Sequence, residues 1–167
     1  MHSGLYVVMG VAGAGKSLIG ASFAAVVGLE FVEGDDFHPA KNIELMSRGV
    51  ALTDDDRAEW LRALALRLRT ADEAGVGVVI ACSALKRAYR DVLRTDTPDV
   101  QFIYLRGSRE LIAQRMDNRS GHFMPASLLD SQFAALEEPA PEENAWVIDI
   151  NRSPAQIIAE LGSRSFR

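Results

Sequence analysis

The sequence has very little cysteine and no long apolar run. Cys82 is the only cysteine among 167 residues, which excludes an internal disulfide and any cysteine-rich metal site. No stretch approaches the roughly 20 consecutive apolar residues that a membrane-spanning helix needs, so we expect no membrane association. The N-terminal residues show neither a charged leader nor a cleavage-type site, so we expect no secretory signal and a cytoplasmic protein.

Basic charge is also scarce, since the formal net charge is −5. Proteins that bind nucleic acid broadly carry a basic face that replaces phosphate counterions, and we therefore expect no nucleic-acid partner. A chain of this length buries roughly 70% of the surface that its unfolded form exposes. We see no internal repeat or linker, and expect one domain over residues 1–167.

Residues 10–17 match the pattern Gly, four residues, Gly-Lys-Ser/Thr, after an apolar run at 5–9 and before a helical segment. Glycines there let backbone amides turn toward a phosphate, and the helix start adds partial positive charge. We expect Lys16 between the β- and γ-phosphates and the Ser17 hydroxyl on Mg²⁺. The predicted nucleotide-binding residues of this P-loop are Gly10, Val11, Ala12, Gly13, Ala14, Gly15, Lys16 and Ser17. The loop alone leaves open whether ATP is hydrolysed, sensed or used as a phosphoryl donor.

Apolar runs alternate with helical patterns along the whole chain. We expect strands at 5–9, 29–33, 78–81, 101–105 and 146–150, with helices between them and after the last. Thr53 and Asp56 have the spacing of a capping box, which predicts the start of a long amphipathic helix. The alternation predicts an α/β P-loop NTPase fold, a five-stranded parallel sheet with helices on both faces.

Motifs of switch and motor proteins are missing. No Asn-Lys-x-Asp motif for guanine occurs, and the Asp-x-x-Gly pattern at 72–75 lies at the end of a predicted helix. The third strand ends at residues 80–83, Ile-Ala-Cys-Ser, without a carboxylate. We interpret Cys82 there as a buried strand residue. These absences disfavour a GTPase or a motor ATPase.

Small kinases place a carboxylate after the second strand and carry an arginine-bearing lid, and both features occur here. Asp35 and Asp36 follow the second strand, at the edge where parallel sheets bind ligands. Arg115 and Arg119 flank an irregular stretch, which we interpret as a mobile lid at about 115–126. Such arginines neutralise charge on the transferring phosphoryl group, and a closed lid excludes water.

Four further blocks occur in order beside the P-loop. They are Gly-Asp-Asp-Phe-His-Pro at 34–39, Leu-Thr-Asp-Asp-Asp-Arg at 52–57, Cys-Ser-Ala-Leu-Lys-Arg at 82–87, and Gly-His-Phe-Met at 121–124 followed by Ser131-Gln132-Phe133. Over nearly the whole chain they resemble the gluconokinase family of P-loop kinases, whose fold is like that of shikimate kinase. The resemblance implies transfer of the ATP γ-phosphoryl group to the 6-hydroxyl of D-gluconate, and it suggests a homodimer.

The chain departs from the family pattern at a few positions. Asp36 stands where a hydrophobic or small residue is expected, Ala51 replaces a common proline, and Ala58-Glu59 replace a lysine-proline type pair. None of these changes removes a proposed catalytic group. Asp36 leaves open which of the two adjacent acids faces the substrate.

A sugar acid has one carboxylate and several hydroxyls, so its pocket needs fixed cations and hydrogen-bonding groups. The candidate substrate-binding residues are Asp35, His38, Arg57, Lys86, Arg90 and His122. Asp35 is the candidate base that deprotonates the hydroxyl, and it also holds Mg²⁺ through water. Lys16 and Arg119 complete the predicted catalytic set. Arg115 and the loop at Asn151 and Arg152 are candidate nucleotide contacts, with Asn151 the predicted residue.

Two other functions stay open. One is a kinase for another small anionic metabolite, such as shikimate or a nucleoside monophosphate, although shikimate kinases are expected to carry a glycine cluster where residues 83–86 read Ser-Ala-Leu-Lys. The other is a non-catalytic nucleotide-sensing module. Lys16, Ser17 and Asp35 disfavour the sensor, because a sensor does not need a phosphoryl-transfer constellation.

Overall fold

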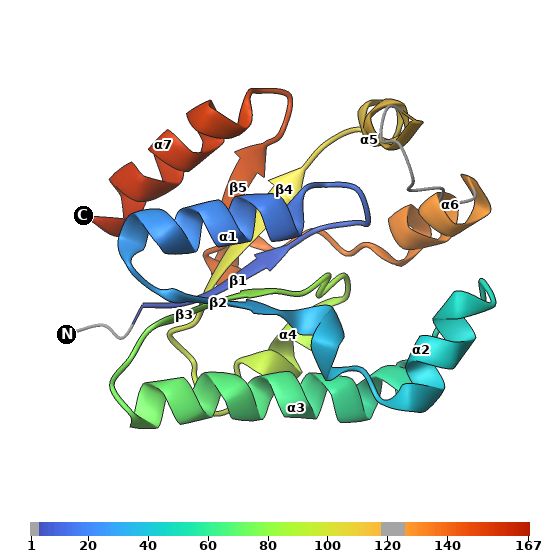
Figure 1. Ribbon diagram of the computed structural model, residues 1–167, viewed down its shortest axis with the longest axis horizontal. Coiled ribbons are helices and arrows are strands. Elements are labelled where there is room, and N and C mark those ends of the chain that lie inside the picture. The colour runs from blue at the N-terminus through green and yellow to red at the C-terminus, as the bar shows by residue number, and fades with distance from the viewer. Residues whose placement is uncertain (1–3, 118–125) are drawn as a thin grey trace.

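The computed structural model describes residues 4–117 and 126–167, and a parallel sheet forms its centre (Figure 1). The strands are β1 (Leu5–Met9), β2 (Glu30–Glu33), β3 (Val78–Ala81), β4 (Gln101–Arg106) and β5 (Trp146–Asp149). They lie side by side in the order β2-β3-β1-β4-β5, and every neighbouring pair is parallel. The predicted five-stranded parallel α/β sheet is confirmed.

Helices cover both faces of the sheet. They are α1 (Lys16–Val27), α2 (Ala40–Ser47), α3 (Asp54–Glu73), α4 (Arg87–Leu93), α5 (Arg109–Asp117), α6 (Ala126–Ala135) and α7 (Pro154–Ser165), with short 3₁₀ turns η1 (Gly34–Phe37) and η2 (Pro141–Glu143). Helices α1 and α7 pack together on one face, and α3 and α4 on the other. Helices α2, α5 and α6 lie at the right of Figure 1, where the strands end.

The core has two halves because side chains alternate along each strand. Val7 and Met9 of β1 are fully buried against α3, where they meet Trp60, Leu64 and Leu68. Val8 points the other way and is fully buried with Phe23 of α1 and Leu161 of α7. The central strand that precedes the P-loop is therefore packed on both faces.

Helix ends follow the local sequence signals. The Thr53 hydroxyl accepts a hydrogen bond from the Asp56 amide at 3.2 Å, and the Asp56 carboxylate accepts one from the Thr53 amide at 2.9 Å. This is the predicted capping box at the start of α3. Gly28 ends α1 with a left-handed φ of 72°, a conformation that glycine adopts without steric penalty.

Two further sequence predictions concern membrane-spanning helices and the lid. No helix of the described residues is long and apolar enough to span a membrane. The predicted lid at about 115–126 falls largely outside the described ranges, as do the candidate residues Arg119 and His122.

Candidate active site

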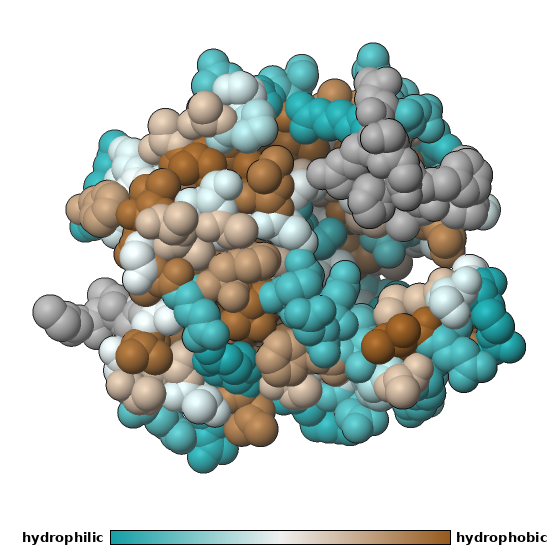
Figure 2. Space-filling view, viewed as in Figure 1, coloured by the Kyte–Doolittle hydropathy of each residue, from teal (hydrophilic) through white to brown (hydrophobic). Residues whose placement is uncertain are grey.

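The carboxyl ends of the strands open into a cavity of about 500 Å³, the acceptor cavity. Its walls come from the P-loop, η1, the end of α2, the start of α3, the loop after β3, and α6. Figure 2 shows the surface hollowed at the right, between α2 and α6. The lining includes Lys16, Glu33, Asp35, His38, Asp54, Arg57, Lys86 and Gln132. One cavity therefore brings the P-loop lysine together with charged residues from several distant segments.

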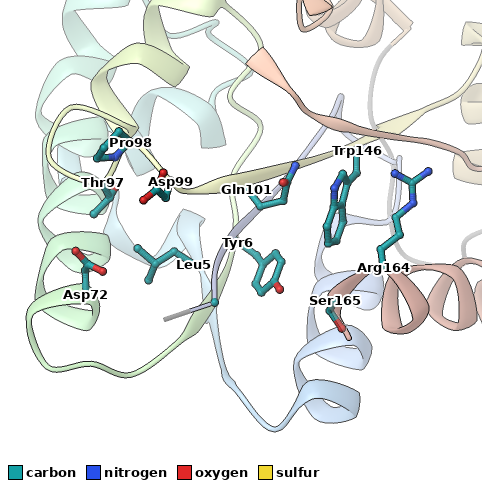
Figure 3. Close-up of a pocket in the computed structure, with 11 residues that line it drawn as sticks. Leu5, Tyr6, Asp72, Thr97, Pro98, Asp99, Gln101, Trp146, Arg164 and Ser165 are labelled. Carbon is teal, nitrogen blue, oxygen red and sulfur yellow. The ribbon is translucent and has the colours of Figure 1, made fainter. Parts of the chain in front are cut away.

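A second cavity, of about 460 Å³, lies at the other end of the strands, where they begin (Figure 3). Tyr6, Gln101 and Trp146 line it from the amino-terminal ends of three strands, beside Arg164 of α7. None of its lining residues belongs to the P-loop. Because parallel α/β sheets bind ligands at the carboxyl ends of their strands, the acceptor cavity is the candidate active site.

The P-loop backbone is shaped as a cradle. Gly13 and Gly15 have left-handed φ angles of 82° and 94°, and Gly15 is the N-cap of α1. A Cβ added to Gly13 would lie 2.8 Å from Met116, and one added to Gly10 would lie 3.0 Å from the Leu105 carbonyl. Only glycine fits these positions without a shift, and the loop ends at the amino terminus of a helix. This geometry fits the phosphate groups of a nucleotide.

Lys16 and Ser17 present a cation and a hydroxyl at the end of this cradle. Lys16 Nζ donates a hydrogen bond to the Val11 carbonyl at 2.9 Å. Burial lowers the pKa of Lys16, and the Asp35 carboxylate is the largest influence opposing that shift. The Ser17 hydroxyl donates to the carboxylate of Glu33, the last residue of β2.

The oxygens of Ser17, Glu33 and Asp35 suit Mg²⁺, which prefers hard oxygen ligands. In P-loop enzymes few protein groups hold this ion, because phosphates and water complete its coordination. Among the described residues, no group of three or more His, Cys, Asp and Glu side chains could hold a metal ion.

Asp35 is placed by a close backbone approach. The preceding residue, Gly34, is buried, and a Cβ there would lie 2.2 Å from the Ala81 carbonyl. Trp60 Nε1 donates a hydrogen bond to the Gly34 carbonyl at 2.8 Å, which fixes η1 against α3. Both acids are exposed, but only Asp35 lines the acceptor cavity. Of the two adjacent acids, Asp35 is the one that faces the P-loop lysine.

His38 lies behind Asp35 in the cavity wall. Its ring is buried, stacks on Trp60 with centroids 4.1 Å apart, and has Nε2 3.8 Å from the Asp35 carboxylate. Nδ1 lies 3.3 Å from the Asn42 amide nitrogen, so Nδ1 accepts and Nε2 carries the proton toward Asp35. Burial lowers the pKa of His38, which Asp35 opposes and Arg57 reinforces. A neutral His38 therefore directs its Nε2–H toward Asp35 without a direct hydrogen bond to it.

Two cations and one carboxylate of the cavity lining, Arg57, Lys86 and Asp54, form a second charged group, which we call the far end. Lys86 Nζ lies 3.2 Å from the Asp54 carboxylate, and Tyr89 donates its hydroxyl proton to the same carboxylate. Arg57 Nη1 donates to the Tyr89 hydroxyl at 3.2 Å and to the Leu52 carbonyl at 2.7 Å. The hydrogen bond to Asp54 raises the pKa of Lys86, so its ammonium stays charged. This end has a local charge of +1, which suits a monoanion.

The prediction that Arg90 binds substrate is wrong. Its guanidinium is fully buried and donates from Nε and Nη2 to the Glu143 carboxylate, at 2.7 and 3.1 Å. Nη1 donates to the Ala84 carbonyl at 2.9 Å, and Ala84 has a left-handed φ of 45°. Arg90 therefore stabilises the strained loop that carries Lys86.

A smaller cavity of about 360 Å³, the donor cavity, adjoins the P-loop on its other side. Arg115 lines it as predicted and donates from Nη2 to the Ile150 carbonyl at 2.6 Å. Asn151 does not line it, and its backbone amide donates a hydrogen bond to the Asp149 carboxylate at 2.8 Å. The neighbouring Arg152 does line this cavity.

Sequence reasoning missed three residues of the acceptor cavity. Glu33 looks like an ordinary strand end, although a carboxylate two residues before Asp35 was the available signal. Asp54 and Gln132 stand in the family blocks without an assigned role. Their roles depend on contacts across more than 15 residues of sequence, as in the Ser17–Glu33 and Lys86–Asp54 pairs.

Comparisons with known proteins agree with this geometry. A family model described as shikimate kinase matches residues 12–165. The thermosensitive gluconokinase of Escherichia coli K12 is 48% identical over 156 residues, covering 91% of this chain and 82% of its own. The gluconokinase of Gluconobacter oxydans is 45% identical, covering 93% and 87%.

A solved structure gives the same answer. The crystal structure of a gluconokinase from Sinorhizobium meliloti 1021 superposes with a TM-score of 0.90 at 45% identity, and the match covers 98% of this chain and 93% of the other. Sequence and structure therefore place this chain in the gluconokinase family of P-loop kinases.

Proposed function

We propose that this protein transfers the γ-phosphoryl group of ATP to the 6-hydroxyl of D-gluconate and releases 6-phosphogluconate and ADP. The observation that carries the proposal is the layout of the acceptor cavity. Lys16 and Asp35 line it from the P-loop and η1, whereas Arg57 and Lys86 line it from α3 and the residue before α4. An acid held by its carboxylate at the far end would extend its terminal hydroxyl toward Asp35.

The residues present support a direct transfer. Asp35 accepts the proton of the 6-hydroxyl, whose oxygen forms a bond to the γ-phosphorus while the bond from that phosphorus to the bridging oxygen breaks. ADP leaves with the electron pair of the broken bond. Lys16 and the P-loop amides stabilise the charge that develops on the phosphoryl oxygens. Mg²⁺, when bound near Ser17, Glu33 and Asp35, supplies further charge neutralisation.

The charge of the far end supports a sugar acid as the acceptor. Arg57, Lys86 and Asp54 sum to +1, which matches a single carboxylate better than the dianion of a nucleoside monophosphate. The Asp54 carboxylate, which lines the cavity, adds a hydrogen-bond acceptor for a polyol chain.

We further propose a cytoplasmic homodimer, on the strength of the gluconokinase resemblance. Light scattering coupled to size-exclusion chromatography tests the dimer, and a mass of one chain, 18.2 kDa, would contradict it.

Burial raises the pKa of the Cys82 thiol to about 12, so this cysteine is a core residue with little thiolate.

The test of the reaction is ADP release by the purified protein with ATP and Mg²⁺. The acceptor panel contains D-gluconate, other sugar acids, shikimate and nucleoside monophosphates. We expect release with D-gluconate and phosphorylation at its terminal hydroxyl, which the product's phosphorus and proton NMR spectra identify. Release with shikimate or a nucleotide but not with D-gluconate would replace the proposed acceptor. Slow release that no acceptor accelerates would favour a nucleotide sensor.

A further inference from the structure

One P-loop amide is already occupied by a side chain from a distant helix. The Ala12 amide donates a hydrogen bond to Gln132 Oε1 of α6 at 2.9 Å, across 120 residues of sequence. When a nucleotide binds, P-loop amides donate hydrogen bonds to its phosphate oxygens. Here a carboxamide oxygen occupies one of them.

Ala12 lies where the donor and acceptor cavities meet. Ala12 and Gln132 line the acceptor cavity with Lys16 and Asp35, whereas residues 13–15 line the donor cavity. The γ-phosphoryl group must pass between these cavities during transfer. Gln132 is therefore next to the path of the transferred group.

Helix α6 holds Gln132 in this place. Leu129, one turn earlier on α6, is buried in the same core half as β1 and α1. Just after α6, the Glu137 amide donates to the Leu85 carbonyl at 2.8 Å, and its carboxylate accepts from the Arg87 amide at 2.9 Å. These bonds tie the end of α6 to the loop that carries Lys86. Gln132 thus lies on an element anchored to the acceptor side.

We propose that Gln132 is a catalytic residue whose carboxamide contacts the transferred phosphoryl group. In the unliganded protein Oε1 takes the place of a phosphoryl oxygen on the Ala12 amide. When ATP binds, a γ-phosphoryl oxygen takes over the Ala12 amide, and the freed carboxamide turns its Nε2–H donor to the same group. A carboxamide can do both because it carries an acceptor and two donors. The proposal rests on the kinase reaction of the preceding section.

Two substitutions separate the acceptor from the donor. Gln132→Glu keeps an acceptor for the Ala12 amide but removes the donor and brings negative charge beside the phosphoryl group. Gln132→Ala removes both groups. Loss of one preorganised donor lowers kcat by roughly 10²- to 10³-fold, and we expect a fall of this order for both variants, with the KM for D-gluconate within about threefold of wild type.

The matched control is Gln114→Glu, which makes the same chemical change at an exposed position of α5. We expect it to have the kcat of the wild-type protein. Wild-type kcat in both Gln132 variants would overturn the proposal.

A readout independent of activity is the Ala12 amide itself, followed by ¹⁵N NMR and hydrogen exchange. We expect slow exchange in the unliganded wild type, faster exchange in Gln132→Ala, and renewed protection of that variant by a non-hydrolysable ATP analogue. An unchanged hydrogen-exchange rate of the Ala12 amide in Gln132→Ala would overturn the proposal that Gln132 Oε1 occupies this amide in the unliganded protein. If the wild type fails to phosphorylate gluconate, the proposed function fails, whereas this amide measurement still decides the role of Gln132 at the phosphate site.

Discussion

The buried Arg90–Glu143 pair is the sharpest place to test whether a predicted substrate residue is structural. Both side chains are at most 2% exposed, and Arg94 adds a second guanidinium to the same carboxylate. The substitutions Arg90→Met and Glu143→Gln each remove one charge of the pair, so the other charge stays buried opposite a neutral side chain. Breaking a buried pair in this way destabilises a protein by about 3–5 kcal/mol.

An independent estimate comes from the titration of Glu143. Burial alone would raise its pKa, but hydrogen bonds from Arg90, the Ala140 amide and Arg94 outweigh burial and lower the pKa to about 2 from an ordinary 4.5. At about 1.4 kcal/mol per pKa unit, this difference corresponds to about 3 kcal/mol of folding stability. The folded pKa is depressed, so the contribution is complete above pH 4.5 and is lost as the pH falls toward 2.

The assay is thermal and denaturant unfolding, together with steady-state kinetics below the unfolding transition. For a domain of this size about 3 kcal/mol lowers the melting temperature by roughly 6–12 °C. We expect that shift for Glu143→Gln at pH 7, a smaller shift at pH 3, and an unchanged KM for gluconate in Arg90→Met. Arg87→Met is the control, because Arg87 and its partner Glu142 are both largely exposed, and we expect no shift. A raised KM with unchanged stability in Arg90→Met would refute the structural role.

Three further predictions follow from the site. Lys16→Ala should lower turnover by several orders of magnitude while the far-ultraviolet circular dichroism stays native. Lys86→Met should raise the KM for gluconate by about tenfold or more and leave the Kd of an ATP analogue unchanged by calorimetry; equal effects on both ligands would count against its place at the acceptor end. Gly34→Ala should destabilise the fold by about 1–3 kcal/mol in denaturant unfolding, because its Cβ would lie 2.2 Å from the Ala81 carbonyl. The resulting shift of the backbone would displace Asp35 and lower kcat. Wild-type stability of this variant would contradict the close approach.

Local patterns were sufficient to predict the elements of the fold. The apolar runs of β1 and β3 are buried on both faces, so they stand out from the helices without any knowledge of their neighbours. The Thr53 capping box and the Gly28 stop depend on residues within one turn of the helix end. The P-loop needs only its own eight residues and the elements on either side.

Residue roles depended on contacts that local patterns do not contain. Arg90 was expected to bind substrate because a sugar-acid pocket needs fixed cations, but its partner Glu143 lies 53 residues away. His38 faces Asp35 because Trp60 of α3 stacks on its ring. Glu33 accepts a hydrogen bond from Ser17 across 16 residues of sequence, although β2 pairs with β3 and not with β1. Charge and spacing identified the cavity, whereas packing between distant segments decided which group each side chain contacts.

The most direct test of the central claim is a single-turnover measurement of phosphoryl transfer by Asp35→Asn, with ATP, Mg²⁺ and gluconate, by rapid quench. The amide keeps the shape of the side chain but cannot accept the hydroxyl proton. Our account predicts a fall of several orders of magnitude in the transfer rate, with calorimetric affinities for gluconate and an ATP analogue within a few-fold of wild type. A wild-type transfer rate in Asp35→Asn would contradict it.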